Sequence, residues 1–328
     1  MKHIINYIVF FICAMNLNAQ TAIIDRYVKE YNRKNPLTHS VIIYRDGDVL
    51  YENYFNNFDS EKLNNLKSVT KSIVSILIGI AIDKGHIESE NVKVSELLPE
   101  LFVGVGDKRK SEITVRDLLT MSAGFQWNNL GGKRRGGWDK SVNPSQYLIQ
   151  NVPLVNNPGD KWNYNSGLSH LLSVIISRTT GMSSLEFARK YLFDPLGIKE
   201  IKWSKANDGV YKGNSELWMK PRDLLKIGML MLNNGVWENE SIVSAEWIEK
   251  STKKYYDGFE QIGGYGYHWH TRKFGEYDSF LAAGWGGQFL IVIPALNTVV
   301  VNTSKWNALS STYMIFDLID KYLINGYK

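Results

Sequence analysis

Ser68 and Lys71 are the two residues whose types and spacing predict chemistry most directly. They stand three positions apart at the head of an apolar segment that runs to Lys84, so on a helix their side chains share one face. The core of that segment, IVSILIGIAI, is apolar on every side, which is typical of a helix buried inside a domain. A desolvated lysine near a helix N-terminus loses its proton more readily and can accept one from a hydroxyl. The pattern predicts a serine nucleophile with a lysine base.

A second Ser-x-x-Lys pair, Ser251 and Lys254, shows that the spacing alone is not specific. Both residue types are common, so the pattern also arises by chance. The second pair lies in the polar stretch STKKYYDG, with no apolar helix behind it. The buried helix therefore favours Ser68 as the nucleophile.

The elements that must position this pair come from both halves of the chain. Residues 22–33 have helical spacing of apolar positions, and the segment SVIIYRDGDVLYENYF alternates around Asp46-Gly47, a β-hairpin signal. The segments GGYGYHWHTR and FLIVIPALNTVVVNTS are rich in strand formers and precede a predicted helix over residues 308–323. The chain between is mostly helical. We predict an α/β (α+β) fold with one antiparallel sheet built from both chain ends, flanking helices, neighbouring termini and an inserted helical region, about residues 86–255.

The first twenty residues have the pattern of a secretory signal peptide. Lys2 precedes an apolar run from Ile4 to Met15, and Leu-Asn-Ala follows. A membrane anchor is the alternative, but the run is shorter than the roughly 20 residues that span a bilayer. We predict a signal peptide over residues 1–20 and a single exported domain over 21–328, periplasmic or secreted. Cys13, the only cysteine, lies inside the signal, so the mature chain has no thiolate nucleophile.

Charge and histidine content argue against nucleic-acid and metal chemistry. The net charge is only +5, and the one tight basic cluster is Lys133, Arg134 and Arg135. We interpret that cluster as a solvated loop, or as a loop over the active site that attracts anionic substrates. His268 and His270 could share an ion from one side of a strand, but no third ligand is near in sequence. We expect no nucleic-acid partner, no metal and no other cofactor.

Several motifs, taken in order, resemble the serine β-lactamase and penicillin-binding superfamily. The resemblance covers nearly the whole mature chain. It is closest to the class C β-lactamase-related esterases, D-aminopeptidases and 6-aminohexanoate-dimer hydrolases. The motifs are the Ser-x-x-Lys helix start, LLTMSAGFQW, PGDKWNYNSG, FDPLGI, MKPRDLLKIGMLMLNNG and AAGWGGQFLIVIP. The resemblance implies a β-lactamase/transpeptidase-like fold and an acyl-enzyme on Ser68.

The same resemblance implies that Tyr164 is the catalytic tyrosine. A phenol beside a lysine can pass a proton to the leaving group and help to activate water. The family motif is Tyr-x-Asn, whereas this chain has Ser166 at the third position. The Ser166 hydroxyl can hydrogen-bond the lysine but lacks the amide N–H that holds a β-lactam side chain. A core aromatic at a helix start is the alternative for Tyr164.

The segment Trp285-Gly286-Gly287 takes the place of the Lys-Thr-Gly strand motif of true β-lactamases. The lysine that helps to bind a β-lactam carboxylate is therefore missing. Glycines here allow a substrate carbonyl to approach the strand backbone, and the backbone amides of Ser68 and Gln288 would form the oxyanion hole. A bulge or hairpin turn is the alternative explanation of these glycines.

Aromatic residues further along the chain could line a substrate groove or pack a core. Trp127 follows the motif Gly-Phe-Gln, and Tyr265, Tyr267 and Trp269 alternate along one predicted strand. Trp127 and Tyr267 are the predicted contacts. We predict hydrolysis of small ester or amide substrates, as by a carboxylesterase, an amidase or a 6-aminohexanoate-dimer hydrolase. The alternatives are a D-amino-acid peptidase, a β-lactamase, or a non-catalytic ligand-binding protein on the same fold.

Overall fold

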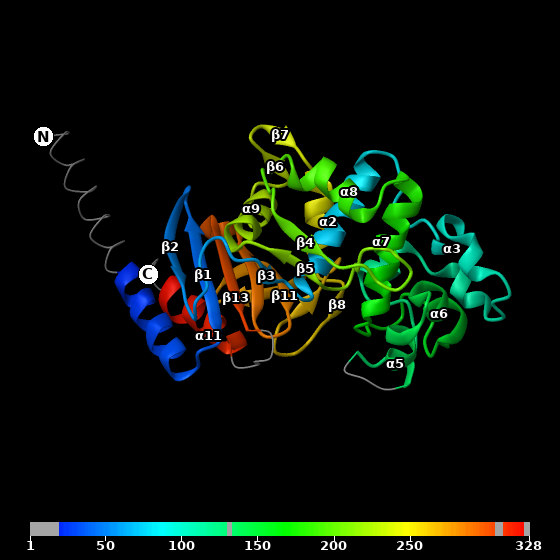
Figure 1. Cartoon of the computed structure of the whole chain (residues 1–328), viewed down its shortest axis with the longest axis horizontal. Helices are drawn as coiled ribbons and strands as arrows, with labels where there is room; N and C mark the ends of the chain where they lie inside the picture. Colours follow the sequence, from blue (N-terminus) through cyan, green and yellow to red (C-terminus); the bar gives the residue numbers. More distant parts are fainter. Residues whose placement is uncertain (1–19, 130–132, 306–310, 325–328) are drawn as a thin grey trace, which may run out of the picture.

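The computed structural model describes residues 20–129, 133–305 and 311–324 of the chain (Figure 1). All but the last residue of the predicted signal peptide lies outside these ranges. Among the described residues, no helix is long and apolar enough to cross a membrane.

An eight-stranded antiparallel sheet joins the two ends of the chain. Its order is β2-β1-β13-β12-β11-β10-β9-β8, and β1 pairs with β13 along seven residue pairs, from Thr38 opposite Ser304 to Arg45 opposite Thr298. The predicted sheet built from both chain ends is confirmed. The strands are β1 Thr38–Arg45, β2 Asp48–Tyr54, β8 Tyr256–Asp257, β9 Gly264–Tyr265, β10 His270–Phe274, β11 Tyr277–Gly284, β12 Gln288–Ile293 and β13 Thr298–Ser304.

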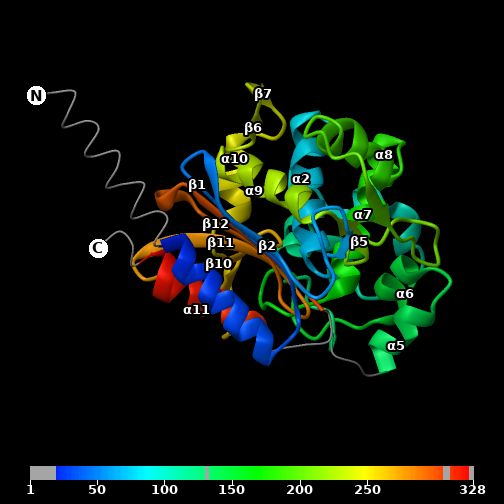
Figure 2. The same cartoon turned by 60° about the vertical axis from the view of Figure 1, so that its left-hand side comes forward.

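One face of this sheet is covered by the first and last helices. A helix over residues 20–34 lies beside α11, Ser311–Leu318, and the π-helical turn Ile319–Leu323 that continues it (Figure 2). The rings of Tyr27 and Tyr322 meet with centroids 4.9 Å apart, and Gln20 donates to the Tyr322 carbonyl. The two ends of the described chain therefore lie together, as predicted.

The opposite face is covered by α2, Val69–Asp83, and α9, Pro221–Leu232. Of the fifteen residues of α2, all from Val69 to Ala81 are buried, which confirms the predicted central helix. Close packing needs small residues here. A methyl group added at Gly228 of α9 would collide with Val299 on the sheet, and one added at Gly79 of α2 would collide with Trp247.

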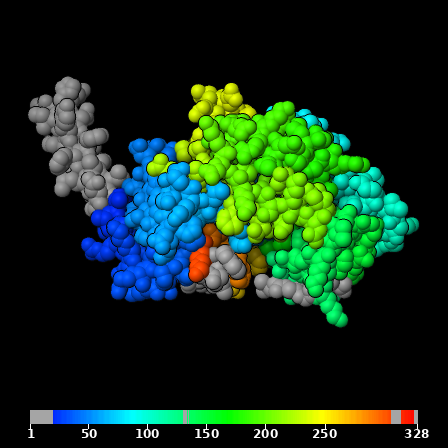
Figure 3. All heavy atoms as spheres, viewed as in Figure 1, coloured from blue at the N-terminus to red at the C-terminus, as the bar shows by residue number. Residues whose placement is uncertain are grey.

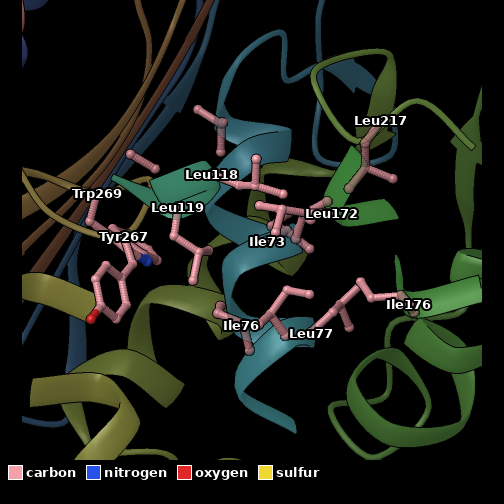
Figure 4. Packing of buried hydrophobic residues seen from close by; sticks show 14 of the residues in the cluster. Ile73, Ile76, Leu77, Leu118, Leu119, Leu172, Ile176, Leu217, Tyr267 and Trp269 are labelled. Atoms are coloured by element: carbon pink, nitrogen blue, oxygen red, sulfur yellow. The ribbon is translucent and has the colours of Figure 1, made fainter. Parts of the chain in front are cut away.

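The helical region packs against the far side of α2. Ile73 and Leu77 of α2 meet Leu172 and Ile176 of α7 in the larger of two apolar clusters (Figure 4). The elements here are α3 Val94–Leu97, α4 Val115–Leu119, α5 Lys133–Lys140, α6 Pro144–Asn151, α7 Ser166–Thr180, α8 Ser184–Ala188 and α10 Ala245–Thr252. Single turns lie at Pro99–Phe102, Lys108–Glu112, Arg189–Phe193 and Pro294–Leu296, and short strands are β3 Asn64–Asn65, β4 Ile201–Trp203, β5 Leu217–Met219, β6 Val236–Trp237 and β7 Glu240–Ser241.

The loop that leads from β2 to α2 is fixed at the surface. It meets the segment before α9 on the face shown in Figure 3, where Lys220 forms ion pairs with Glu61 at 2.8 Å and Glu200 at 2.9 Å. Exposed pairs contribute little stability each. Their effect is to hold the approach to α2 in one place.

The predicted strand through Tyr265, Tyr267 and Trp269 is wrong. Strand β9 ends at Tyr265, β10 begins at His270, and the residues between them bend. His268 has a left-handed backbone, φ 62°, and that conformation interrupts an extended strand. His268 and His270 therefore do not sit on one side of one strand.

Candidate active site

Ser68 lies at the N-cap of α2, directly after a strained turn. Lys67 has φ 49°, a left-handed conformation that costs on the order of 1 kcal/mol or more in a residue other than glycine. The Lys67 amide donates to Asn65 Oδ1 at 3.0 Å, and the Lys67 ammonium pairs with Glu216 at 3.2 Å. These contacts hold the turn. Ser68 is half-buried while α2 behind it is buried, so the hydroxyl stands at the edge of the core.

Lys71 meets the Ser68 hydroxyl inside the protein. Its Nζ lies 3.0 Å from Ser68 Oγ and donates to the Asn214 carbonyl at 2.7 Å. The side chain is buried, with 2% exposure. Burial is the main cause that lowers the pKa of Lys71 from 10.5 to about 7, and the positive charge of Arg135 adds to it. A lysine in this state can be neutral near pH 7 and can accept the serine proton.

Asn214 was not predicted. The sequence allowed a hydrogen bond between the Ser166 hydroxyl and the lysine, whereas the second acceptor in the structure is the Asn214 backbone carbonyl. A carbonyl is present at every position, so no residue type in the sequence could identify this contact. A carbonyl also carries no full charge. The Lys71 ammonium therefore has a hydrogen-bond acceptor without a neighbouring anion, which would raise its pKa.

Tyr164 stands over the same lysine. The Lys71 Nζ lies 5.0 Å from the centroid of the Tyr164 ring. Burial raises the pKa of Tyr164 to about 12, against the opposing effect of a hydrogen bond with Ser68. The phenol thus remains protonated when Lys71 is neutral. It also packs against Phe259 with ring centroids 5.1 Å apart. Ser68, Lys71 and Tyr164 are brought together, as the sequence predicted.

Asn129 is a second residue that sequence reasoning missed. Its Oδ1 accepts from the Ser166 amide at 3.2 Å, from Trp127 Nε1 at 3.3 Å and from Arg135 Nη1 at 3.3 Å. Ser166 begins α7, two residues after Tyr164. Asn129 thereby connects two of the predicted contacts, Trp127 and Ser166, to a basic side chain. Trp127 is mostly buried against Trp138, with ring planes at 84°.

The basic cluster is helical in the structure. Residues Lys133–Lys140 form α5, so the expected loop is wrong. Arg135 pairs with Asp139 at 2.8 Å, and its charge reaches both Lys71 and Tyr164 because it lowers the pKa of each. The second interpretation, a loop over the active site that attracts anionic substrates, stays a prediction as to substrates; what the structure adds is that the Arg135 charge acts on two residues of the site.

The segment Trp285-Gly286-Gly287 lies in the turn between β11 and β12, not on a strand. Gly286 and Gly287 have φ 82° and 86°, so the tight turn explains these glycines directly. Trp285 is 49% exposed. The turn nevertheless borders the segment that leads into Ser68, because Gly284 approaches the Leu66 carbonyl so closely that an added methyl group would collide with it.

Gln288 follows this turn and is fixed by its own side chain. Its Nε2 donates to the Ser304 carbonyl at 2.6 Å, and its Oε1 accepts from the Ser304 amide at 3.1 Å. The Gln288 side chain is therefore hydrogen-bonded to β13. Only the backbone amide of Gln288 remains for a role near Ser68. This placement is compatible with the predicted oxyanion hole.

Tyr267 is a packing residue rather than a substrate contact. It is 1% exposed, and it lies in the buried cluster with Trp269 and Leu119 (Figure 4). Its ring stacks on Tyr255 with the planes at 5°. The predicted alternation left a groove contact and core packing both open for Tyr267, and its burial agrees with core packing.

Both histidines favour the neutral form. Burial, and to a smaller extent the charge of Lys71, lowers the pKa of His268 well below its usual value and that of His270 to about 3. Within the described ranges, no group of three His, Cys, Asp or Glu side chains converges to hold a metal ion.

Replacing Gly284 by alanine is expected to slow acylation by about tenfold or more while leaving the protein folded. The added methyl group would meet the Leu66 carbonyl and the Gln288 side chain, and the resulting shift would separate Ser68 from Gln288, where donors aligned to a developing oxyanion are worth a few kcal/mol each. Gly106→Ala is the control, because Gly106 is exposed, has open space around it and, like Gly284, has no left-handed φ. Equal acylation rates for Gly284→Ala and the wild type would contradict this arrangement.

The pH dependence of kcat/KM should report Lys71. Only the neutral amine can accept the Ser68 proton, so kcat/KM is expected to rise with pH through about 7, the pKa of Lys71. Arg135→Ala removes a positive charge that lowers this pKa, so the midpoint should move to higher pH. Arg135→Lys keeps the charge and should leave the midpoint nearly unchanged. A midpoint that stays in place in Arg135→Ala would show that Arg135 does not act on the base.

Comparison with known proteins agrees with the geometry. A 6-aminohexanoate-dimer hydrolase from Paenarthrobacter ureafaciens is 26% identical over 299 residues, covering 84% of this chain and 75% of that protein. A lovastatin esterase from Penicillium rubens is 30% identical over 156 residues, 42% of this chain and 39% of that protein.

A solved penicillin-binding protein homologue from Pyrococcus abyssi has the same fold, with a TM-score of 0.75 at 21% identity over 93% of this chain and 77% of that one. The predicted β-lactamase/transpeptidase-like fold is confirmed. Residues 24–314 match the Beta-lactamase family, and the chain belongs to that family.

Proposed function

We propose that the protein is a serine hydrolase that opens small ester or amide substrates through an acyl-enzyme on Ser68. Neutral Lys71 takes the hydroxyl proton as Ser68 attacks the substrate carbonyl. The backbone amides of Ser68 and Gln288 stabilise the oxyanion, and the leaving group departs with a proton passed by Tyr164. Water then repeats these steps on the acyl-enzyme and releases the acid.

One observation carries this proposal. The Lys71 ammonium is buried 3.0 Å from Ser68 Oγ, and the causes that shift its pKa include burial and a positive charge but no carboxylate. A lysine held for structure alone would be expected beside an anion, since burying an unpaired ammonium costs several kcal/mol. Such a cost is consistent with a base that must release its proton.

The proposed substrate class rests on the site's surroundings. Trp285 and Phe259 are large apolar side chains, 49% and 38% exposed, and Phe259 packs directly on Tyr164. Exposed aromatic surface beside a nucleophile suits an apolar acyl or alcohol group. The related hydrolase and esterase named above support the same class, and Trp127 and Ser166 are further proposed contacts.

A substrate panel tests the proposal. We expect turnover of p-nitrophenyl esters or of the 6-aminohexanoate dimer, with an acyl group trapped on the peptide that contains Ser68. Preferential turnover of D-alanyl peptides would instead favour a D-amino-acid peptidase, and that of nitrocefin a β-lactamase. Binding without turnover of any substrate would indicate a non-catalytic protein and would overturn the proposal.

We also propose that the protein is exported after removal of residues 1–20. The support is the charged and apolar pattern of Lys2 to Met15 followed by Leu-Asn-Ala. N-terminal sequencing of the protein recovered from the periplasm or medium should begin near Thr21. Recovery of the intact N-terminus in the cytoplasm would contradict export.

A further inference from the structure

His268, close to the catalytic lysine, combines an unfavourable backbone conformation with an unpaired buried ring nitrogen. Its backbone is left-handed at φ 62° although it is not glycine, a conformation that is strained for a residue with a side chain. Its Nε2 is buried and has no hydrogen-bond partner among the residues that the structure describes, which also costs free energy. Such costs concentrate at functional sites, where the surrounding structure maintains them.

The backbone of His268 is tied to the helix that carries Lys71. Its N–H donates to the Leu119 carbonyl at 3.0 Å and to the Gly266 carbonyl at 3.1 Å. Its carbonyl accepts from Ser72 Oγ at 2.6 Å, and Ser72 directly follows Lys71 on α2. Hydrogen bonds to both its N–H and its carbonyl therefore fix the strained backbone of His268, and one of them comes from the residue next to Lys71.

The ring of His268 contacts Tyr265, which in turn packs against Tyr164. Its Nδ1 lies 3.3 Å from the Tyr265 hydroxyl. Tyr265 is buried and meets Tyr164 edge-on, with centroids 6.2 Å apart and planes at 88°. Trp162 and His270 also pack edge-on against the Tyr265 ring, at 5.6 Å and 4.8 Å. The Tyr265 ring therefore has little freedom to turn.

We propose that His268 is a positioning residue that fixes Tyr164, through Tyr265, relative to Lys71. The inference rests on the proposed function, since it gives a role to a contact of that site. The main chain of His268 hydrogen-bonds Ser72 of α2, the helix that carries Lys71. Its ring contacts Tyr265, which packs against Tyr164. The distance between the two proton-carrying groups is thereby set, and an error of about 1 Å in such a distance can cost about a hundredfold in rate.

A neutral imidazole suits this role. Burial and the charge of Lys71 both lower the pKa of His268, so the ring can occupy the space beside an ammonium without repelling it. Tyr265, which contacts its ring, and His270 are the other titratable groups that act on it. Burial keeps the Tyr265 phenol protonated and lowers the pKa of His270 to about 3. The contact therefore persists across the pH range in which Lys71 titrates.

Three variants test the inference, with p-nitrophenyl acetate as substrate. His268→Gly accepts the left-handed backbone and deletes the ring, and Tyr265→Phe removes only the hydroxyl. Each should lower the acylation rate and kcat by about tenfold or more while KM stays within about twofold. His268→Asn tolerates the left-handed backbone and returns a polar atom to Tyr265, so it should recover most of the lost rate.

Asn239→Gly is the matched control. Asn239 has φ 67° in an exposed turn, so the substitution relieves the same strain away from Ser68 and should leave kcat unchanged. Wild-type acylation rates in both Tyr265→Phe and a folded His268→Gly would overturn the inference. If His268→Gly does not fold, Tyr265→Phe decides alone. Fluorophosphonate labelling of the wild type separates the two proposals, because its absence would reject the proposed function itself.

Discussion

Replacing Ser68 by alanine is expected to abolish covalent labelling by a fluorophosphonate and to lower kcat/KM by about four orders of magnitude or more. Ser68 is the proposed nucleophile, and its loss would remove the covalent route that the proposed mechanism assigns to Lys71 and Tyr164. The fold should be unaffected, since Ser68 is half-buried and its hydroxyl faces other residues of the site. Intact-protein mass spectrometry after labelling measures the adduct directly.

Ser251→Ala is the control for this experiment. Ser251 begins the second Ser-x-x-Lys pair, but its hydroxyl is buried and donates to the Ile248 carbonyl at 3.1 Å. Its partner in the pattern, Lys254, pairs with Asp257 at the surface. Labelling should persist in Ser251→Ala. An adduct that survives in Ser68→Ala would show that the nucleophile lies elsewhere.

Replacing Lys71 by methionine should slow acylation by two or more orders of magnitude and should stabilise the protein. Methionine fills similar space without a charge, so the base is lost. The wild-type pKa is about 7 when folded and 10.5 otherwise, and each unit is worth about 1.4 kcal/mol. Between those values the unfolded chain binds the extra proton, so wild-type stability rises with pH. The Tm advantage of Lys71→Met should therefore be largest at pH 7 and below and shrink toward pH 10.5.

The result depends on two opposing changes. Lys71→Met leaves the Asn214 carbonyl without its ammonium donor, which subtracts about 1 kcal/mol from the gain at every pH. The slope of the Tm difference against pH is the decisive quantity, since that loss does not titrate. A flat difference across pH 7–10.5 would mean that Lys71 stays charged in the folded protein and is not the base. Tyr164→Phe should also slow acylation about a hundredfold without producing such a slope.

The contact between Ser68 and Lys71 could be predicted because its signal is local. Ser68 and Lys71 share one helix, and the apolar residues behind them fix its burial within a few turns. Asn129 and Asn214 could not be predicted, because each acts through a loop whose path is set by distant contacts, and Asn214 acts through its backbone. Tyr267 was misplaced for a related reason. Nothing in the sequence marks His268 as left-handed, and one such residue ends the alternation on which the prediction depended.

The pairing of β1 with β13 has a consequence for when the surroundings of Ser68 can first form. Thr38 lies opposite Ser304, so the sheet cannot close until Ser304 has left the ribosome. Contacts this distant in sequence form slowly, and the strands β11 to β13 that complete the surroundings of Ser68 emerge long after Ser68 itself. A nascent chain thus carries Ser68 through much of its synthesis without the turn that must face it, and the site assembles only once β13 has emerged.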